Sequence, residues 1–294
     1  MLQPIFMKQT YISYNGTCIL RKDFGISPAN RSFRYGDGVF ETIRVEDGTM
    51  LWASRHYQRL RRSAAILQMI LPGSFGPDAM REQVMELYHK NQPDGGAARI
   101  RFSLFRSDGG LYTPLSNLSA HLIESEEIPG PGYPFPAEGL QVDIFPDMGK
   151  PLGTLSNLKT SSALMFVMAS LYKTRENLND CLILNHHGTI AEATSSNVFL
   201  VRGQDLQTPG LDQDCVDGVM RSVIMDLAKN NGLKVRETPL TLGQVEHADE
   251  LFLTNTISGL SWVQRFRHVN YKNRVAARLS AILNETVRKE KAKG

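Results

Sequence analysis

Lys159 is one residue of this chain that could do covalent chemistry, because it stands beside the apolar run 163–169, which we expect to form a buried helix. A lysine next to a buried segment is desolvated, so its pKa falls and its amine can form an imine with an aldehyde. The alternative is a lysine that flanks a helix and extends its amine into water, which is the commoner case for a lysine taken alone.

Two further segments carry groups that suit a buried charge or an anion. Glu192 interrupts an apolar stretch shortly before a predicted strand. A buried carboxylate needs a partner because an unpaired buried charge is costly, and the alternative is a loop acid followed by a Ser/Thr turn. Gly218 precedes a predicted helix, so the backbone N–H groups at that helix start could hold a phosphate.

The remaining candidate segments are basic or rich in glycine. Residues 55–62 begin an amphipathic helix, whose arginines form a solvated face by default and an anion site otherwise. Within 34–44, two glycines surround Asp37, which predicts a tight hairpin turn ahead of a strand. Arg99 and Arg101 lie two residues apart in a predicted strand and therefore share one of its faces.

The elements that must position these residues are both strands and helices, which predicts a mixed α/β (α+β) fold. Residues 128–136 contain four prolines and two glycines, so we expect an interdomain linker between an α+β domain (1–127) and a C-terminal domain (137–294). The expected strands are 11–15, 39–45, 98–105, 139–145, 180–185, 196–201, 234–239 and 250–254, and the expected helices are 55–69, 78–90, 161–177, 219–230 and 274–290.

Composition excludes several classes of protein. The 294 residues include 33 Lys plus Arg, 30 Asp plus Glu and 41% hydrophobic residues, which is typical of a globular chain and lacks the basic excess of a nucleic-acid surface. Cys18, Cys181 and Cys215 form no C-x-x-C pair, so we expect no metal site and a reducing cytoplasm as the location. We expect neither a targeting peptide nor a membrane span, and Met1 or Met7 could be the start.

Taken in order, the candidate segments resemble the class IV aminotransferases, which are fold-type IV enzymes that use pyridoxal 5′-phosphate. The resemblance extends from about residue 11 to residue 269. The motifs that carry it are Tyr-Gly-Asp-Gly-Val-Phe-Glu (35–41), His-x-x-Arg-Leu (56–60), Leu-Lys-Thr (158–160), Glu-Ala-Thr-Ser-Ser-Asn-Val-Phe (192–199), Gly-Val-Met-Arg (218–221) and Leu-Thr-Asn-Thr (253–256).

The resemblance implies a two-domain fold, with a curved or barrel-like sheet in the C-terminal domain and the cofactor between the domains. It implies that Lys159 holds the cofactor as an imine and then moves a proton between the substrate α-carbon and C4′ of the cofactor. Glu192 would keep the pyridine nitrogen protonated. The phosphate would be bound by Arg59, the backbone N–H groups of Val219 and Met220, Asn255 and Thr256, and the ring would be supported by Ser195, Ser196 and Asn197.

Departures from the family patterns bear on the substrate. Leu164 stands where branched-chain aminotransferases have a tyrosine, and Phe40 stands where D-amino-acid aminotransferases have one. The Arg-x-His pair of the D-amino-acid enzymes is missing from residues 106–113, and residues 108–114 look closer to the Gly-Gly loop of the aminodeoxychorismate lyases.

The resemblance leaves an unusual supply of arginines near the expected substrate. We hypothesise that Arg34, Arg99 and Arg101 bind substrate carboxylates, with Phe40 and Tyr112 also in the substrate site; the alternative is a solvated basic strand face. Members of the family pair as homodimers, so we expect Arg34 and the 108–112 loop to act across the subunit interface.

We therefore predict a transaminase that exchanges an amino group between an amino acid and a 2-oxo acid such as 2-oxoglutarate, with neither nucleic acid nor membrane as a partner. D-amino acids are favoured as donors because Leu164 and residues 195–197 match that group. The alternatives are an aminodeoxychorismate lyase, an L-branched-chain amino acid aminotransferase, and a catalytically silent interaction module. The last is disfavoured because Lys159, Glu192 and Arg59 are all present.

Overall fold

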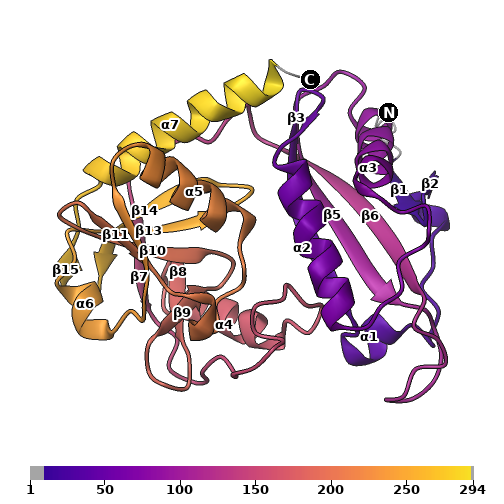
Figure 1. Ribbon diagram of the computed structural model, residues 1–294, viewed down its shortest axis with the longest axis horizontal. Coiled ribbons are helices and arrows are strands. Elements are labelled where there is room, and N and C mark those ends of the chain that lie inside the picture. The colour runs from indigo at the N-terminus through magenta and orange to yellow at the C-terminus, as the bar shows by residue number, and fades with distance from the viewer. Residues whose placement is uncertain (1–9, 293–294) are drawn as a thin grey trace, which may run out of the picture. The chain divides into compact units, whose positions relative to one another are not determined.

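The computed structural model describes residues 10–292, which form two compact units (Figure 1). The first unit ends at Pro131 and the second begins at Gly132, so the division lies inside the proline-rich segment. Part of that segment is packed rather than extended, because Tyr133 is 2% exposed and its hydroxyl donates to Thr256 O at 3.0 Å. The question of the start at Met1 or Met7 falls outside the described residues.

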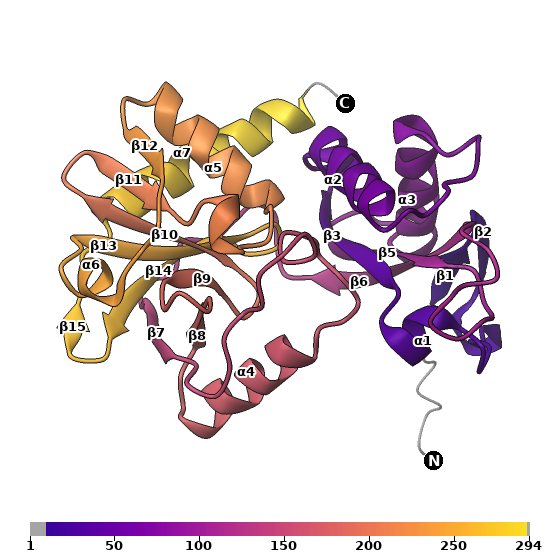
Figure 2. The ribbon, with the colours of Figure 1, turned by 60° about the horizontal axis from the view of Figure 1, so that its bottom comes forward.

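The first unit is an antiparallel sheet in the order β2-β1-β6-β5-β3-β4, with two long helices on one face (Figure 2). Helix α2 buries residues 56, 59, 60, 63 and 64, which is the spacing of one helix face. That face and α3 share one apolar core with the sheet. The elements are β1 (Tyr11–Tyr14), β2 (Thr17–Leu20), α1 (Arg31–Tyr35), β3 (Gly38–Glu46), β4 (Thr49–Met50), α2 (Ala53–Ile66), α3 (Pro77–Asn91), β5 (Ala97–Arg106) and β6 (Ser119–Ile128).

The second unit is a curled sheet in the order β12-β11-β10-β13-β14-β7-β8-β9, with β15 paired to β14. Helices α5 and α7 pack together on β13 and β14, and α4 packs on β8. The elements are β7 (Leu140–Ile144), α4 (Leu164–Arg175), β8 (Asp180–Leu184), β9 (Ile190–Ala193), β10 (Asn197–Arg202), β11 (Asp205–Thr208), α5 (Val219–Asn230), β12 (Lys234–Glu237), α6 (Leu242–Glu246), β13 (Glu250–Asn255), β14 (Gly259–Phe266), β15 (Val269–Asn270) and α7 (Arg274–Lys291).

The predicted buried helix at 163–169 is wrong about burial. Helix α4 is present, but Leu164 and Leu171 are 73% and 59% exposed, and Ala169 is the buried residue of the helix. The reason is that only one side of α4 packs on β8, while the apolar residues of the run occupy more than one side.

The predicted hairpin at Asp37 is also wrong. Residues 31–35 form the short helix α1, which ends at Gly36 with φ of 66°, and the chain then enters β3 at Gly38. Glycine adopts this left-handed conformation without a steric penalty, so the motif makes a helix-to-strand corner.

Within residues 10–292, no helix is both long and apolar enough to cross a membrane.

Candidate active site

Glu192 is a buried acid with a partner on each carboxylate oxygen. It lies in β9, is 4% exposed, and receives hydrogen bonds from Lys150 Nζ on Oε1 and from the Val216 backbone N–H on Oε2, the latter at 3.1 Å. The structure therefore excludes the loop-acid interpretation. Sequence reasoning missed Lys150, which stands between a glycine and a proline without any local pattern.

The turn that binds Glu192 also builds the start of α5. Asn197 at the beginning of β10 donates from Nδ2 to Val216 O at 2.8 Å. Gly218 precedes α5, and a Cβ atom there would lie 1.9 Å from Asn197 Oδ1, so only glycine allows this close approach. Gly218 is the N-cap residue of α5 and has no side chain that could accept a hydrogen bond from the first turn of the helix. The first N–H groups of α5, including those of Val219 and Met220, have no partner within the helix and can bind an anion.

The ends of two neighbouring strands bring further predicted residues to the same unit. Asn197 of β10 pairs with Thr254 of β13, and Asn255 Nδ2 donates to Ser196 Oγ at 3.0 Å. Ser196, Asn197 and Thr256 are buried, whereas Ser195 is exposed. Thr254 Oγ1 is buried without a hydrogen-bond partner among the described residues. Directly opposed residues of an antiparallel pair point to the same face of the sheet, so the Thr254 hydroxyl lies on the same face as the Asn197 side chain.

The segment that carries Lys159 is tied to the same turn. Asn157 donates from Nδ2 to Cys215 O at 2.7 Å, and its own carbonyl accepts the Asp217 N–H at 3.1 Å. Lys159 follows two residues later and is partly buried, ahead of α4. Residues 215–217 therefore connect the lysine segment, the Glu192 carboxylate and the start of α5 within the second unit.

Arg59 lies in the first unit and is buried on the core-facing side of α2. Its Nε donates to Glu41 Oε1 at 2.8 Å and its Nη2 to Oε2 at 2.5 Å, while His56 Nδ1 lies 2.6 Å from Oε2. Burial alone would raise the pKa of Glu41, but the Arg59 charge and the hydrogen bonds from His56 and Arg59 outweigh burial and lower it to about 2. The interpretation of Arg59 as part of a solvated face is wrong.

The residues expected near the substrate differ in their surroundings. The Arg101 guanidinium lies 3.7 Å from the centroid of the Phe40 ring, and burial lowers the pKa of Arg101. Arg99 is about half exposed and 3.8 Å from Glu126, and Arg34 is exposed with its Nε on Pro28 O. The structure thus brings Phe40 and Arg101 together and leaves Arg99 and Arg34 on the surface of the first unit.

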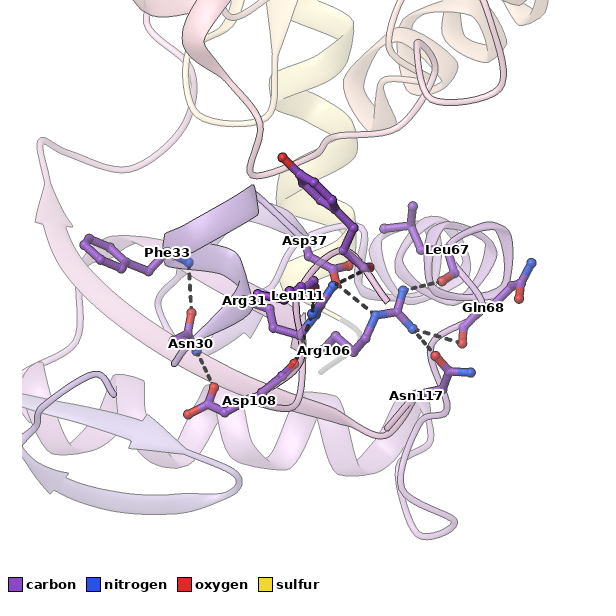
Figure 3. A network of polar contacts seen from close by, with 12 residues as sticks. Asn30, Arg31, Phe33, Asp37, Leu67, Gln68, Arg106, Asp108, Leu111 and Asn117 are labelled. Carbon is purple, nitrogen blue, oxygen red and sulfur yellow. Dashed lines mark hydrogen bonds and ion pairs between the residues drawn. The ribbon is translucent and has the colours of Figure 1, made fainter. Parts of the chain in front are cut away.

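Arg31 and Arg106 both bind the Asp37 carboxylate, and both donate hydrogen bonds to the loop that carries Tyr112 (Figure 3). Asp37 Oδ2 accepts from Arg31 Nε at 2.8 Å and from Arg106 Nε at 2.9 Å. Arg31 also donates to the carbonyls of Gly109 and Tyr112, so the loop backbone is fixed while the Tyr112 side chain is 89% exposed. Burial alone would raise the pKa of Asp37, but the bonds from Arg106 and Arg31 lower it below its usual value.

The chain is similar to known proteins of one family over most of its length. The family model of amino-transferase class IV matches residues 38–281. Aminodeoxychorismate lyase of Bacillus subtilis is 29% identical over 277 residues, which is 92% of each chain. A probable branched-chain-amino-acid aminotransferase of Synechocystis is 29% identical over 84% of this chain and 82% of its own, and D-alanine aminotransferase of Bacillus licheniformis is 28% identical over 83% and 84%.

Solved structures share the fold. The branched-chain amino acid aminotransferase of Escherichia coli superposes with a TM-score of 0.81 at 25% identity, over 92% of each chain. The branched-chain aminotransferase of the thermophilic archaeon Thermoproteus uzoniensis, solved with norvaline, has a TM-score of 0.86 at 19% identity, over 97% of each chain. The curled sheet of the second unit and the antiparallel sheet of the first are therefore those of a known enzyme fold.

Proposed function

Because the chain belongs to the class IV aminotransferases, we propose that it is a pyridoxal 5′-phosphate enzyme that moves an amino group from an amino acid to a 2-oxo acid. The observation that carries the proposal is the turn at 215–217, to which the Lys159 segment, Glu192 and the start of α5 are all attached. These are an amine, an acid and an anion site on one framework.

The residues of the second unit fit this cofactor. The uncapped start of α5 suits a phosphate, and the buried, unpartnered Thr254 hydroxyl shows a polar group in that region that nothing in the described chain satisfies. Glu192 is buried and fixed in place by two donors, which suits an acid that binds a ring N–H. When bound, pyridoxal phosphate withdraws electrons from the substrate α-carbon and so makes its proton removable.

Each residue then has a defined role. Lys159 binds the cofactor through its Nζ and afterwards carries the proton to and from the substrate α-carbon. Glu192 accepts a hydrogen bond from the ring nitrogen and keeps it protonated. In the second unit the phosphate is bound by the backbone N–H groups of Val219 and Met220 together with Asn255 and Thr256, and the ring is supported by Ser195, Ser196 and Asn197. Arg59, on the first unit, is a further candidate phosphate ligand.

For the substrate we propose a 2-oxo acid with a second carboxylate, such as 2-oxoglutarate. Arg101 supports this because, among the described residues, its guanidinium forms no ion pair and lies against the Phe40 ring. Arg34, Arg99 and Tyr112 are further candidates on the same unit. Among donors we propose D-amino acids, which the D-alanine aminotransferase relative supports.

A second candidate is an aminodeoxychorismate lyase, because the relative of that name matches 92% of this chain. It would use the same Lys159 and Glu192 but would need no 2-oxo acid as acceptor. An L-branched-chain aminotransferase is the third candidate, supported by the Synechocystis relative.

We propose that the active form is a homodimer. The first unit exposes large apolar side chains at α1 and in the loop between β5 and β6, and burying such side chains stabilises association. These side chains are Phe33, Leu111, Tyr112 and Leu115, with exposures between 74% and 89%. Sedimentation velocity at micromolar concentration should give a dimer mass, and a monomer would contradict the proposal.

The proposal is tested by the visible spectrum of the cofactor-loaded protein. Addition of D-alanine, D-glutamate, L-glutamate or L-leucine, one at a time and without acceptor, should bleach the long-wavelength band with the preferred donor. Bleaching by D-amino acids alone supports the D-specific transaminase, and bleaching by L-leucine or L-glutamate supports the branched-chain group. Bound cofactor without any bleaching favours the lyase, and activity that survives Lys159→Ala would contradict the whole mechanism.

A further inference from the structure

Lys150 is a second lysine at the proposed cofactor site. It is 4% exposed, and its Nζ donates to Glu192 Oε1 inside the second unit. We infer that Lys150 is a positioning residue, which pairs with Glu192 and aims its carboxylate before the cofactor binds, and which shares that carboxylate with the ring nitrogen afterwards. This inference rests on the proposed function of Glu192.

The backbone and the neighbours of Lys150 restrict where its amine can lie. Its backbone N–H donates to Leu184 O at 2.7 Å, and residues 150 and 185 form a parallel bridge beside β8. The centroid of the Phe166 ring lies 5.6 Å from Nζ. A surface lysine loses conformational entropy when it forms an ion pair, whereas Lys150 is already held by its backbone and by packing.

The hydrogen bonds of Glu192 leave room for the cofactor without loss of Lys150. Oε1 accepts from Lys150 and Oε2 accepts from Val216 N–H. Each carboxylate oxygen can accept two hydrogen bonds, so a ring N–H can be added as a third donor. In the described part of the chain, Lys150 is the cation paired with Glu192, and it therefore supplies the counter-charge of the cofactor-free protein.

Lys150 is placed to bind the Glu192 carboxylate and not to form the covalent bond to the cofactor. In pyridoxal phosphate the aldehyde carbon is attached to the ring position opposite the nitrogen. An amine that touches the acid at the nitrogen is therefore at the wrong end of the ring for the aldehyde. Lys159 is attached to the same turn by a different residue, Asn157, which leaves the two lysines in separate roles.

The test compares the melting temperature (Tm) of the protein with and without bound pyridoxal phosphate. Lys150→Met leaves Glu192 buried without a counter-charge, so the Tm of the cofactor-free protein should fall by roughly 10 °C. Bound cofactor brings a positive ring nitrogen to Glu192 and should recover more than half of this loss. Lys150→Arg should restore most of the Tm, and Lys229→Met, at an exposed site in α5, should change neither form.

A purely structural lysine would cost the same Tm in both forms, and that result would overturn the inference. If Lys150→Met does not fold, the double variant Lys150→Met/Glu192→Gln removes both charges and should fold; failure of the double variant would also overturn it.

Reduction with borohydride followed by peptide mapping identifies the lysine that holds the cofactor. We expect the label on the peptide that contains Lys159 in the wild type and in Lys150→Met, and a label on Lys150 would overturn the positioning role. Protein that retains no cofactor after dialysis would contradict the proposed function and this inference together. Cofactor bound to Lys159 with equal Tm losses in both forms would contradict this inference alone.

Discussion

Arg59 of α2 and Glu41 of β3 form a buried two-point ion pair, with Nε 2.8 Å from Oε1 and Nη2 2.5 Å from Oε2. His56 approaches the same carboxylate from one helix turn earlier. A guanidinium held by two parallel bonds loses little freedom when a ligand binds it, because its direction is already set. Glu41 therefore prepares Arg59 for the phosphate that we propose it binds.

Replacing Glu41 by glutamine keeps the shape of the side chain and removes its charge. We expect Glu41→Gln to raise the Kd for pyridoxal phosphate about tenfold, because charge-assisted bonds of about 1.5–3 kcal/mol orient Arg59. An absorbance titration of the cofactor-free protein measures this. Glu82→Gln, at an exposed position of α3, is the matched control, and equal Kd values for both variants would show that Glu41 does not position Arg59.

Glu41 also predicts how stability depends on pH. Its pKa is lowered from 4.5 to about 2 in the folded protein, so the stabilisation is complete above pH 4.5 and is lost as the pH falls through about 2. The shift corresponds to roughly 3 kcal/mol of unfolding free energy. Urea unfolding at pH 7, 4 and 3 should show a difference between wild type and Glu41→Gln that shrinks as the pH falls, and a constant difference would contradict this account.

Local pattern predicts parts of this structure well. The expected helix 219–230 has the observed bounds of α5, and the expectation that a buried Glu192 needs a partner is met by Lys150 and Val216 N–H. Strand β6 was missed because its second half, Glu124 to Ile128, contains three glutamates and looks like a polar segment. Its strand conformation comes from ten residue pairs with β5, which no local pattern contains.

The same limit explains the missed site residues. The buried face of α2 could have been found from the spacing of residues 56, 59, 60, 63 and 64, but two of them are His and Arg, which a hydrophobic pattern excludes. Their burial depends on Glu41, which lies on another element. Lys150 and Glu192 are 42 residues apart, and it is the pairing of residue 150 beside β8 and the place of Glu192 in β9 that bring them together.

Arg101 should matter for the substrate and not for the cofactor. Arg101→Ala removes a guanidinium that forms no ion pair among the described residues, so we expect KM for the 2-oxo acid to rise about 10–100-fold while the Kd for pyridoxal phosphate stays the same. Steady-state kinetics at saturating donor measures the change, with Arg81→Ala on the exposed side of α3 as control. Unchanged KM and kcat would remove Arg101 from the site.

Asp37 should control the mobility of the loop that presents Tyr112. In Asp37→Asn the two arginines lose the charge that holds them together, so the backbone bonds from Arg31 to the loop weaken (Figure 3). Hydrogen exchange of the amides at 109–117 should become at least about tenfold faster, a local opening easier by about 1.4 kcal/mol. Asp78→Asn, at an exposed position of α3, should leave this exchange unchanged. An exchange rate in Asp37→Asn equal to that of the wild type would show that Asp37 does not hold the loop.

Gly218 should be intolerant of even one added methyl group. A Cβ atom there would stand 1.9 Å from Asn197 Oδ1, which is far inside van der Waals contact, so Gly218→Ala must push Asn197 away from Val216 or shift the first turn of α5. Either movement disturbs the proposed phosphate site, and we expect the Kd for pyridoxal phosphate to rise at least about tenfold, equal to about 1.4 kcal/mol. Gly243→Ala is the matched control, because a Cβ atom at that position in α6 meets nothing within 4 Å. Equal cofactor affinity in the two variants would mean that the start of α5 does not bind the phosphate, and the anion site would have to be sought elsewhere on the chain.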